Sequence, residues 1–164
     1  MALQLELSEP YETAFIELEK AWVGSRSGRI DLWYGFRDPE YGELNCAVEL
    51  KFPKRANHRE PNNRYDVFAD LARLEEFTEK YDLGYLFVVT DHPHYHSAKR
   101  YSEATASFDF RDGSSYNAGS QLVYNTAKPH GEPIVLQGDY QFSWSAVRNG
   151  LRFLSTEVHA ADNR

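Results

Sequence analysis

Asp31, Glu49 and Lys51 are the residues of this chain whose types and spacing best suit chemistry. Asp31 lies in one β-rich run, and Glu49 and Lys51 flank Leu50 in the next. Because side chains alternate along a strand, Glu49 and Lys51 are expected on one face and Leu50 on the other. Charges in so apolar a strand are costly to bury, and a bound divalent cation would compensate the carboxylates. The spacing therefore favours a metal site with an ammonium beside two carboxylates.

A hairpin of two strands is the element that must hold these residues. The runs 29–34 and 45–52 are rich in β-forming residues, and the segment 37–42 between them contains a proline and a glycine. Two such runs joined by a short Pro/Gly turn predict an antiparallel hairpin. Asp31 then lies on the first strand and can reach the Glu-x-Lys pair if its side chain faces the same way.

Two helices and a further strand are expected around the hairpin. Ser8 is a typical helix N-cap and Gly24 a typical stop, and apolar residues recur between them at helical spacing, which predicts a helix over about 9–23. A second such pattern predicts a helix over about 64–82. The apolar run 85–90 that follows is typical of a buried strand, so helix and strand together indicate a crossover within one sheet.

The pattern weakens beyond residue 91. We expect a helix there over 94–106 and three short strands over 121–125, 133–137 and 140–145. The chain is therefore expected to be a single α/β domain over residues 1–164, with a mixed central sheet flanked by helices in the order α-β-β-α-β. Its core spans about 8–91, and a β-rich C-terminal extension spans about 92–164.

Composition excludes several classes of protein. The chain has 164 residues, of which 41% are hydrophobic and 26% charged, as in ordinary globular proteins. No apolar run approaches the roughly 20 residues of a membrane-spanning helix, and the N-terminal residues lack the features of a signal peptide. Cys46 is the single cysteine, so no internal disulfide forms, which favours the cytoplasm. The net charge of −7 disfavours nucleic-acid binding over the whole surface, although not at a local basic patch.

The order of elements and the residues Asp31 and Glu49-x-Lys51 resemble the PD-(D/E)XK nuclease superfamily, which has the restriction-endonuclease-like fold. The resemblance covers about residues 8–91. It implies that Asp31, Glu49 and the carbonyl group of Leu50 hold Mg²⁺ or Mn²⁺. It also implies that Lys51 positions the attacking water or helps to deprotonate it. Hard oxygen ligands suit these ions, which stabilise charge in the transition state.

Acids from the two predicted helices are further candidates for this site. Several members of the superfamily add an acid from the first helix, and Glu12 is the candidate here, with Glu19 as the alternative; an exposed helix acid is the simpler interpretation. Asp70, in the second helix, can orient Lys51. It can equally form a plain salt bridge with Arg73, three residues further on.

The segment 51–64 is the basic part of an otherwise acidic chain. It has five basic residues and one acid, a net charge of +4. Because it begins at the expected metal site, it is a candidate for binding the phosphate backbone of a nucleic acid. The candidate phosphate-binding residues are Lys54, Arg55, Arg59 and Arg64. A loop that only faces solvent is the alternative.

The sequence thus predicts a Mg²⁺-dependent nuclease that hydrolyses phosphodiester bonds, with DNA as the favoured substrate. Cleavage of both strands would need two active sites, so a homodimer is expected. The candidate dimer interface is the aromatic C-terminal part, with Tyr116, Tyr124, Tyr140, Phe142 and Trp144. The alternatives are a nuclease-like module that binds without catalysis, and an unrelated α+β domain in which Glu-x-Lys occurs by chance.

Overall fold

A mixed sheet of six strands forms the centre of the protein. The computed structural model describes residues 12–25 and 28–160. The strands are β1 (Glu12–Trp22), β2 (Gly28–Asp38), β3 (Gly42–Lys51), β4 (Leu83–Thr90), β9 (Ser145–Ala146) and β10 (Arg152–Val158). Their order in the sheet is β1-β2-β3-β4-β10-β9. Neighbouring strands are antiparallel except β3 and β4, which are parallel.

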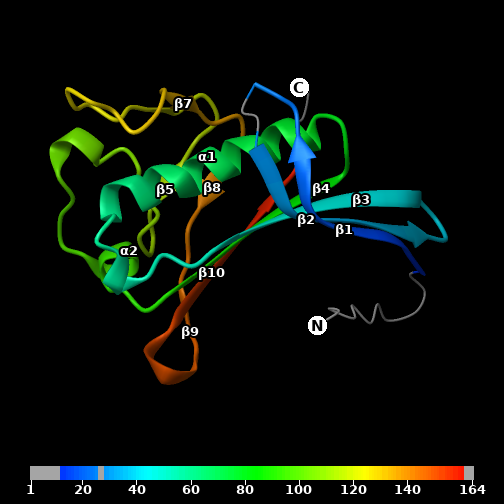
Figure 1. Ribbon diagram of the computed structural model, residues 1–164, viewed down its shortest axis with the longest axis horizontal. Coiled ribbons are helices and arrows are strands. Elements are labelled where there is room, and N and C mark those ends of the chain that lie inside the picture. Colours follow the sequence, from blue (N-terminus) through cyan, green and yellow to red (C-terminus); the bar gives the residue numbers. More distant parts are fainter. Residues whose placement is uncertain (1–11, 26–27, 161–164) are drawn as a thin grey trace.

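One long helix, α1 (Glu60–Thr78), lies along one face of this sheet (Figure 1). Its side chains Phe68, Leu71 and Leu74 are fully buried in the core. The helix connects the parallel strands β3 and β4, so the predicted hairpin, second helix, strand and crossover are confirmed, with small shifts of their ends. Within residues 12–25 and 28–160, no helix is long and apolar enough to cross a membrane.

The predicted first helix is wrong. Within the described residues, the segment 12–22 is strand β1, which pairs with β2 from Glu12 opposite Arg37 to Trp22 opposite Gly28. Its apolar spacing fits a helix, but β2 has a free edge whose backbone groups need partners, and long-range pairing outweighs local propensity. The element order is therefore β-β-β-α-β. The predicted N-cap Ser8 lies outside the described residues.

The segment after β4 is broken into short pieces, several of which lie alongside α1 (Figure 1). They are α2 (His94–Ser97), η2 (Glu103–Thr105), β5 (Ser115–Tyr116), β6 (Gln121–Leu122), β7 (Ile134–Val135), β8 (Tyr140–Gln141) and η3 (Arg148–Gly150). A further short helix, η1 (Arg55–Asn57), precedes α1. The helix predicted over 94–106 is thus only α2 and η2, since the backbone becomes extended at Ala98. The three predicted short strands contain β6, β7 and β8.

The C-terminal part belongs to the core rather than forming an extension. Strand β10 pairs with the whole of β4, from Arg152 opposite Thr90 to Val158 opposite Gly84. The aromatic side chains of 140, 142 and 144 are buried, with Phe142 packed against Phe68 of α1. They are therefore not a free surface, and the prediction that they form a dimer interface is wrong.

Candidate active site

Five charged side chains meet where β2, β3 and α1 come together. Alternation along β3 directs Glu49 and Lys51 toward α1, while Leu50 lies on the other face of the sheet and is 55% exposed. Helix α1 contributes Asp70 and Arg73, which are one turn apart. Asp31 of β2 completes the group. We call these residues the charged cluster: Asp31, Glu49, Lys51, Asp70 and Arg73.

Asp31 holds its place because the β2–β3 ladder ends beside it. The final backbone pair joins Leu32 to Val48. One residue further, the carboxylate of Asp31 takes over the role of a backbone acceptor, since its Oδ2 accepts the N–H of Leu50 at 2.7 Å. The side chain is thereby fixed against β3 at the level of Glu49. The prediction that Asp31 can reach the Glu-x-Lys strand is confirmed.

Ion pairs connect the other four members of the cluster. The Arg73 guanidinium bridges two carboxylates, with Nη1 2.6 Å from Glu49 Oε1 and 3.1 Å from Asp70 Oδ1. Lys51 Nζ lies 2.7 Å from Asp70 Oδ2. Asp70 therefore contacts both Lys51 and Arg73, so its two predicted roles coexist. The cluster has three acids and two bases, and its net charge is −1 when all five groups are ionised.

Burial dominates the electrostatics of the cluster. Glu49 is only 1% exposed, and burial together with the neighbouring Asp70 raises its pKa to about 8 in spite of Arg73. Burial also raises the pKa of Asp70 against the opposing effect of Lys51. For Lys51, burial lowers the pKa, but the carboxylates of Asp70, Glu49 and Asp31 outweigh it and raise the pKa overall. Lys51 is thus an ammonium held among carboxylates.

The raised pKa of Glu49 predicts how stability depends on pH. The folded protein keeps the proton of Glu49 up to a pH of about 8, whereas an unperturbed glutamate loses it near 4.5. Between these values the folded state binds more protons, so the free energy of unfolding should fall as pH rises. Urea unfolding of the wild type and Glu49→Gln over this range measures the effect, and Glu49→Gln should show a flatter profile. Parallel profiles would contradict it.

The donor groups of the cluster suit a hard divalent cation. Asp31 keeps Oδ1 and Glu49 keeps Oε2 outside the hydrogen bonds described above. These two carboxylate oxygens and the carbonyl oxygen of Leu50 are the ligand types that Mg²⁺ prefers. The described residues contain no compact group of three or more His, Cys, Asp or Glu side chains for a metal. The site would therefore depend on the two carboxylates and the backbone.

The predicted acid from the first element does not join the cluster. Glu12 is on a strand, and its backbone lies opposite Arg37, which is six residues along β2 from Asp31. At about 3.3 Å per residue this separation is roughly 20 Å. The alternative, Glu19, falls between the pairs that flank Asp31 and has a positive φ of 52°, so it interrupts the regular strand. Of the two acids, Glu19 lies at the level of the cluster.

The predicted phosphate-binding residues divide into two groups. Lys54, Arg55 and Arg59 are exposed, and the backbone N–H of Arg55 donates to Asp91 Oδ1 at 2.8 Å, which ties this loop to the end of β4. Arg64 is only 1% exposed, so its assignment to nucleic-acid binding is wrong. Its guanidinium donates to the backbone and hydroxyl of Thr105 and lies over the Tyr101 ring.

A cavity of about 200 Å³ opens beside Lys51. Its walls are Lys51, Phe52, Pro53, Asn57, Asn63, Asp66 and Val67. It connects the charged cluster with the loop that carries the exposed basic residues. A group bound in this cavity would therefore lie between the Lys51 ammonium and the basic loop.

The contribution of Arg73 to the site is what sequence reasoning misses. By sequence, Arg73 is only a partner of Asp70, three residues away on the same helix. Arg73 lies on α1 and contacts Glu49 on β3. The only local signal for this contact is that Arg73 lies one turn from Asp70 on the same face of the helix.

Comparison with known proteins finds no matching family model, no matching curated protein and no matching solved structure.

Proposed function

We propose that this protein is a metal-dependent nuclease whose active site is the charged cluster. The observation that carries the proposal is the convergence of Asp31 and Glu49 from adjacent strands, with Lys51 on the same side as Glu49. Carboxylates beside an ammonium are the groups that hydrolysis of a phosphodiester by an activated water needs. The resemblance to the PD-(D/E)XK superfamily, read from the same residues, supports the same chemistry.

Each group of the chain has a separate task in this proposal. Asp31, Glu49 and the Leu50 carbonyl would hold Mg²⁺, which supplies charge stabilisation and a more acidic bound water. Lys51, held by Asp70, keeps its positive charge, so it orients the water or stabilises the phosphate rather than removing a proton. Arg73 lies against Glu49 and offsets part of the negative charge of the cluster.

The exposed basic loop supports nucleic acid as the substrate. Lys54, Arg55 and Arg59 reach solvent close to the cavity beside Lys51. Positive charges next to a hydrolytic centre attract a phosphate backbone and hold it without regard to sequence. DNA is the substrate we propose.

Reversing two loop charges should flatten the salt dependence of DNA binding. In Arg55→Glu/Arg59→Glu, the slope of log K against log salt should fall by about one for each phosphate that the protein no longer neutralises, on all sequences alike. Fluorescence anisotropy of a labelled duplex over a salt series measures this slope. The pair Lys99→Glu/Arg100→Glu, with the same charge change outside the loop, is the control. An unchanged slope in the Arg55/Arg59 variant would show that the loop only faces solvent.

Incubation with nucleic acid is the direct test of the proposed activity. Supercoiled plasmid and single-stranded DNA are each incubated with the protein in Mg²⁺, in Mn²⁺ or in EDTA. The proposal requires cleavage that depends on the metal. Absence of cleavage of both substrates in both metals would contradict it.

A non-catalytic nuclease-like module is the second candidate, and the position of Arg73 favours it. A guanidinium bridging Glu49 and Asp70 neutralises part of the cluster, as a metal would. Calorimetric titration with Mg²⁺ and Mn²⁺ separates the candidates. The module predicts no saturable binding of either ion, whereas the nuclease predicts one site that Glu49→Gln weakens.

A further inference from the structure

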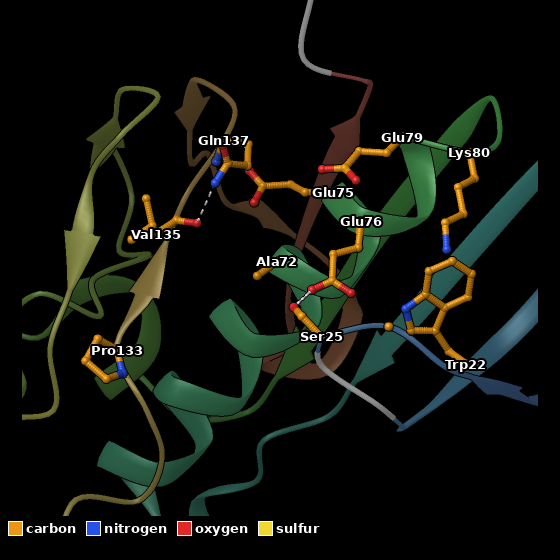
Figure 2. Close-up of a pocket in the computed structure, with 11 residues that line it drawn as sticks. Trp22, Ser25, Ala72, Glu75, Glu76, Glu79, Lys80, Pro133, Val135 and Gln137 are labelled. Carbon is orange, nitrogen blue, oxygen red and sulfur yellow. Dashed lines mark hydrogen bonds between the residues drawn. The ribbon is translucent and has the colours of Figure 1, made fainter.

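A second cavity, of about 500 Å³, lies away from the charged cluster. It is bounded by the end of β1, the C-terminal half of α1 and the segment 133–137 (Figure 2). None of the five residues of the charged cluster lines it. One wall is apolar and is formed by Ala72, Pro133 and Val135. The other wall is acidic and contains Glu75, Glu76 and Glu79. This volume is large enough for a small organic molecule.

One of the acidic side chains on its wall is used by the fold through one of its two oxygens. Glu75 Oε1 accepts hydrogen bonds from the Tyr140 hydroxyl at 2.7 Å and from the backbone N–H groups of Gln137 and Gly138 at 2.8 and 2.9 Å. Glu75 therefore anchors the segment 137–140 to α1.

Two other polar atoms on the wall lack hydrogen-bond partners among the described residues. The Trp22 side chain is 7% exposed, and its indole Nε1 has no acceptor. Oε2 of Glu76 is also buried without a donor, while its Oε1 accepts from the Ser25 hydroxyl. Figure 2 shows the Trp22 nitrogen turned toward Glu76. A buried donor and a buried acceptor at one cavity would gain from a ligand that supplies both partners.

Gly24 allows these two atoms to lie close to the backbone. A Cβ placed on Gly24 would be 2.2 Å from Glu76 Oε2 and 2.6 Å from Trp22 Nε1. Any larger residue would therefore push the Glu76 carboxylate, the Trp22 indole or both out of these positions. The glycine keeps the donor and the acceptor at the same end of the cavity.

The charge of the wall selects the class of ligand. Among the described lining residues, Glu76 and Glu79 face the cavity with one cation, Lys80, whose ammonium lies over the Trp22 ring at 5.1 Å. We propose that this cavity binds a small organic cation, a protonated amine with a hydrogen-bond acceptor a few atoms away. The ammonium binds Glu76 and Glu79, the acceptor receives the Trp22 N–H, and the carbon chain packs on the apolar wall.

The indole N–H of Trp22 provides a direct readout. The chain has three tryptophans, and the other two indoles are occupied, since Trp33 donates to Asn45 and Trp144 to the Phe110 carbonyl. In a proton–nitrogen correlation spectrum, titration with β-alaninamide should move the Trp22 indole signal saturably and leave the other two in place. Trp22→Phe assigns the signal. A Kd in the millimolar range or better is expected for so small a ligand.

Matched ligands and variants make the result decisive. Propanamide, which lacks the amine, should not bind, and propylamine, which lacks the acceptor, should bind more weakly. Glu76→Gln should weaken β-alaninamide binding about ten- to a hundredfold, the usual value of a hydrogen bond to a charged group. Glu40→Gln, in the β2–β3 turn, should change nothing.

Gly24→Ala tests the same site without changing any polar group, and it should also weaken binding. Three results would overturn the proposal. They are no saturable shift of the Trp22 signal, equal binding of propanamide, and unchanged affinity in Glu76→Gln. The first would mean that water, or the Trp22 N–H and the Glu76 carboxylate pairing with each other, satisfies the two buried atoms.

Discussion

Lys51→Ala is expected to lower the rate of DNA cleavage by about 10²–10³-fold, the usual loss when a group that stabilises charge in the transition state is removed. The ammonium lies 2.7 Å from Asp70 and on the same face of β3 as Glu49. In the proposed mechanism it therefore lies where the water would attack. Initial rates of plasmid nicking at saturating DNA measure the effect, and calorimetry should show that Mg²⁺ still binds.

The neighbouring basic residue supplies the control. Lys54→Ala removes the same charge from the exposed loop, so it should weaken DNA binding slightly and leave the rate at saturating DNA unchanged. If Lys51 were only a structural partner of Asp70, its removal would lower stability but leave the rate per folded molecule intact. A Lys51→Ala protein that cuts plasmid at the wild-type rate would therefore refute the proposed mechanism.

Glu49→Gln is expected to abolish cleavage and to weaken divalent-ion binding by at least about 10–100-fold, because even residues that only support metal ligands have effects of this size. The fold should persist. With a pKa raised to about 8, Glu49 of the metal-free protein is largely protonated at neutral pH, and glutamine is close to that form in shape and charge. Circular dichroism, calorimetry and plasmid cleavage together measure these three properties.

Glu43→Gln is the matched control, since Glu43 is an exposed residue at the opposite end of the same strand. It should leave metal binding and cleavage unchanged. Equal Mg²⁺ affinity in wild type and Glu49→Gln would remove Glu49 from the metal site. Loss of the folded spectrum would show instead that its contact with Arg73 is needed for folding.

The parts of the fold that could be predicted are those with a strong local signal. The hairpin, α1 and β4 each have turn residues at their ends and a clear apolar period, and the prediction is correct for all three. The apolar residues Phe15, Leu18 and Trp22 recur at helical spacing, so local pattern alone could not identify β1. What decides is the free edge of β2, which is a tertiary property.

In the candidate site too, the part that could be predicted is the part with a local sequence signal. Glu49 and Lys51 share a face because they are two residues apart on one strand, and this follows from sequence alone. The contact of Arg73 with Glu49 joins residues 24 positions apart, so it depends on how α1 packs on β3. Arg64 belongs to a basic segment by sequence, yet its side chain is buried and donates hydrogen bonds to the carbonyl groups of Thr105 and Phe108. The Arg64 contacts have no signal in the local pattern, and the position of Arg73 one turn from Asp70 is the only local signal for its contact with Glu49.

The position of β10 determines when the six-stranded sheet can be completed. This strand, residues 152–158, lies between β4 and β9 and pairs with β4 from Gly84 to Thr90. During synthesis, one edge of β4 stays unpaired until residues 152–158 have been made. Such an edge readily pairs with another chain. The ion pairs and the Asp31–Leu50 hydrogen bond of the charged cluster join residues within 31–73, but the sheet that supports them is completed only when β10 pairs with β4.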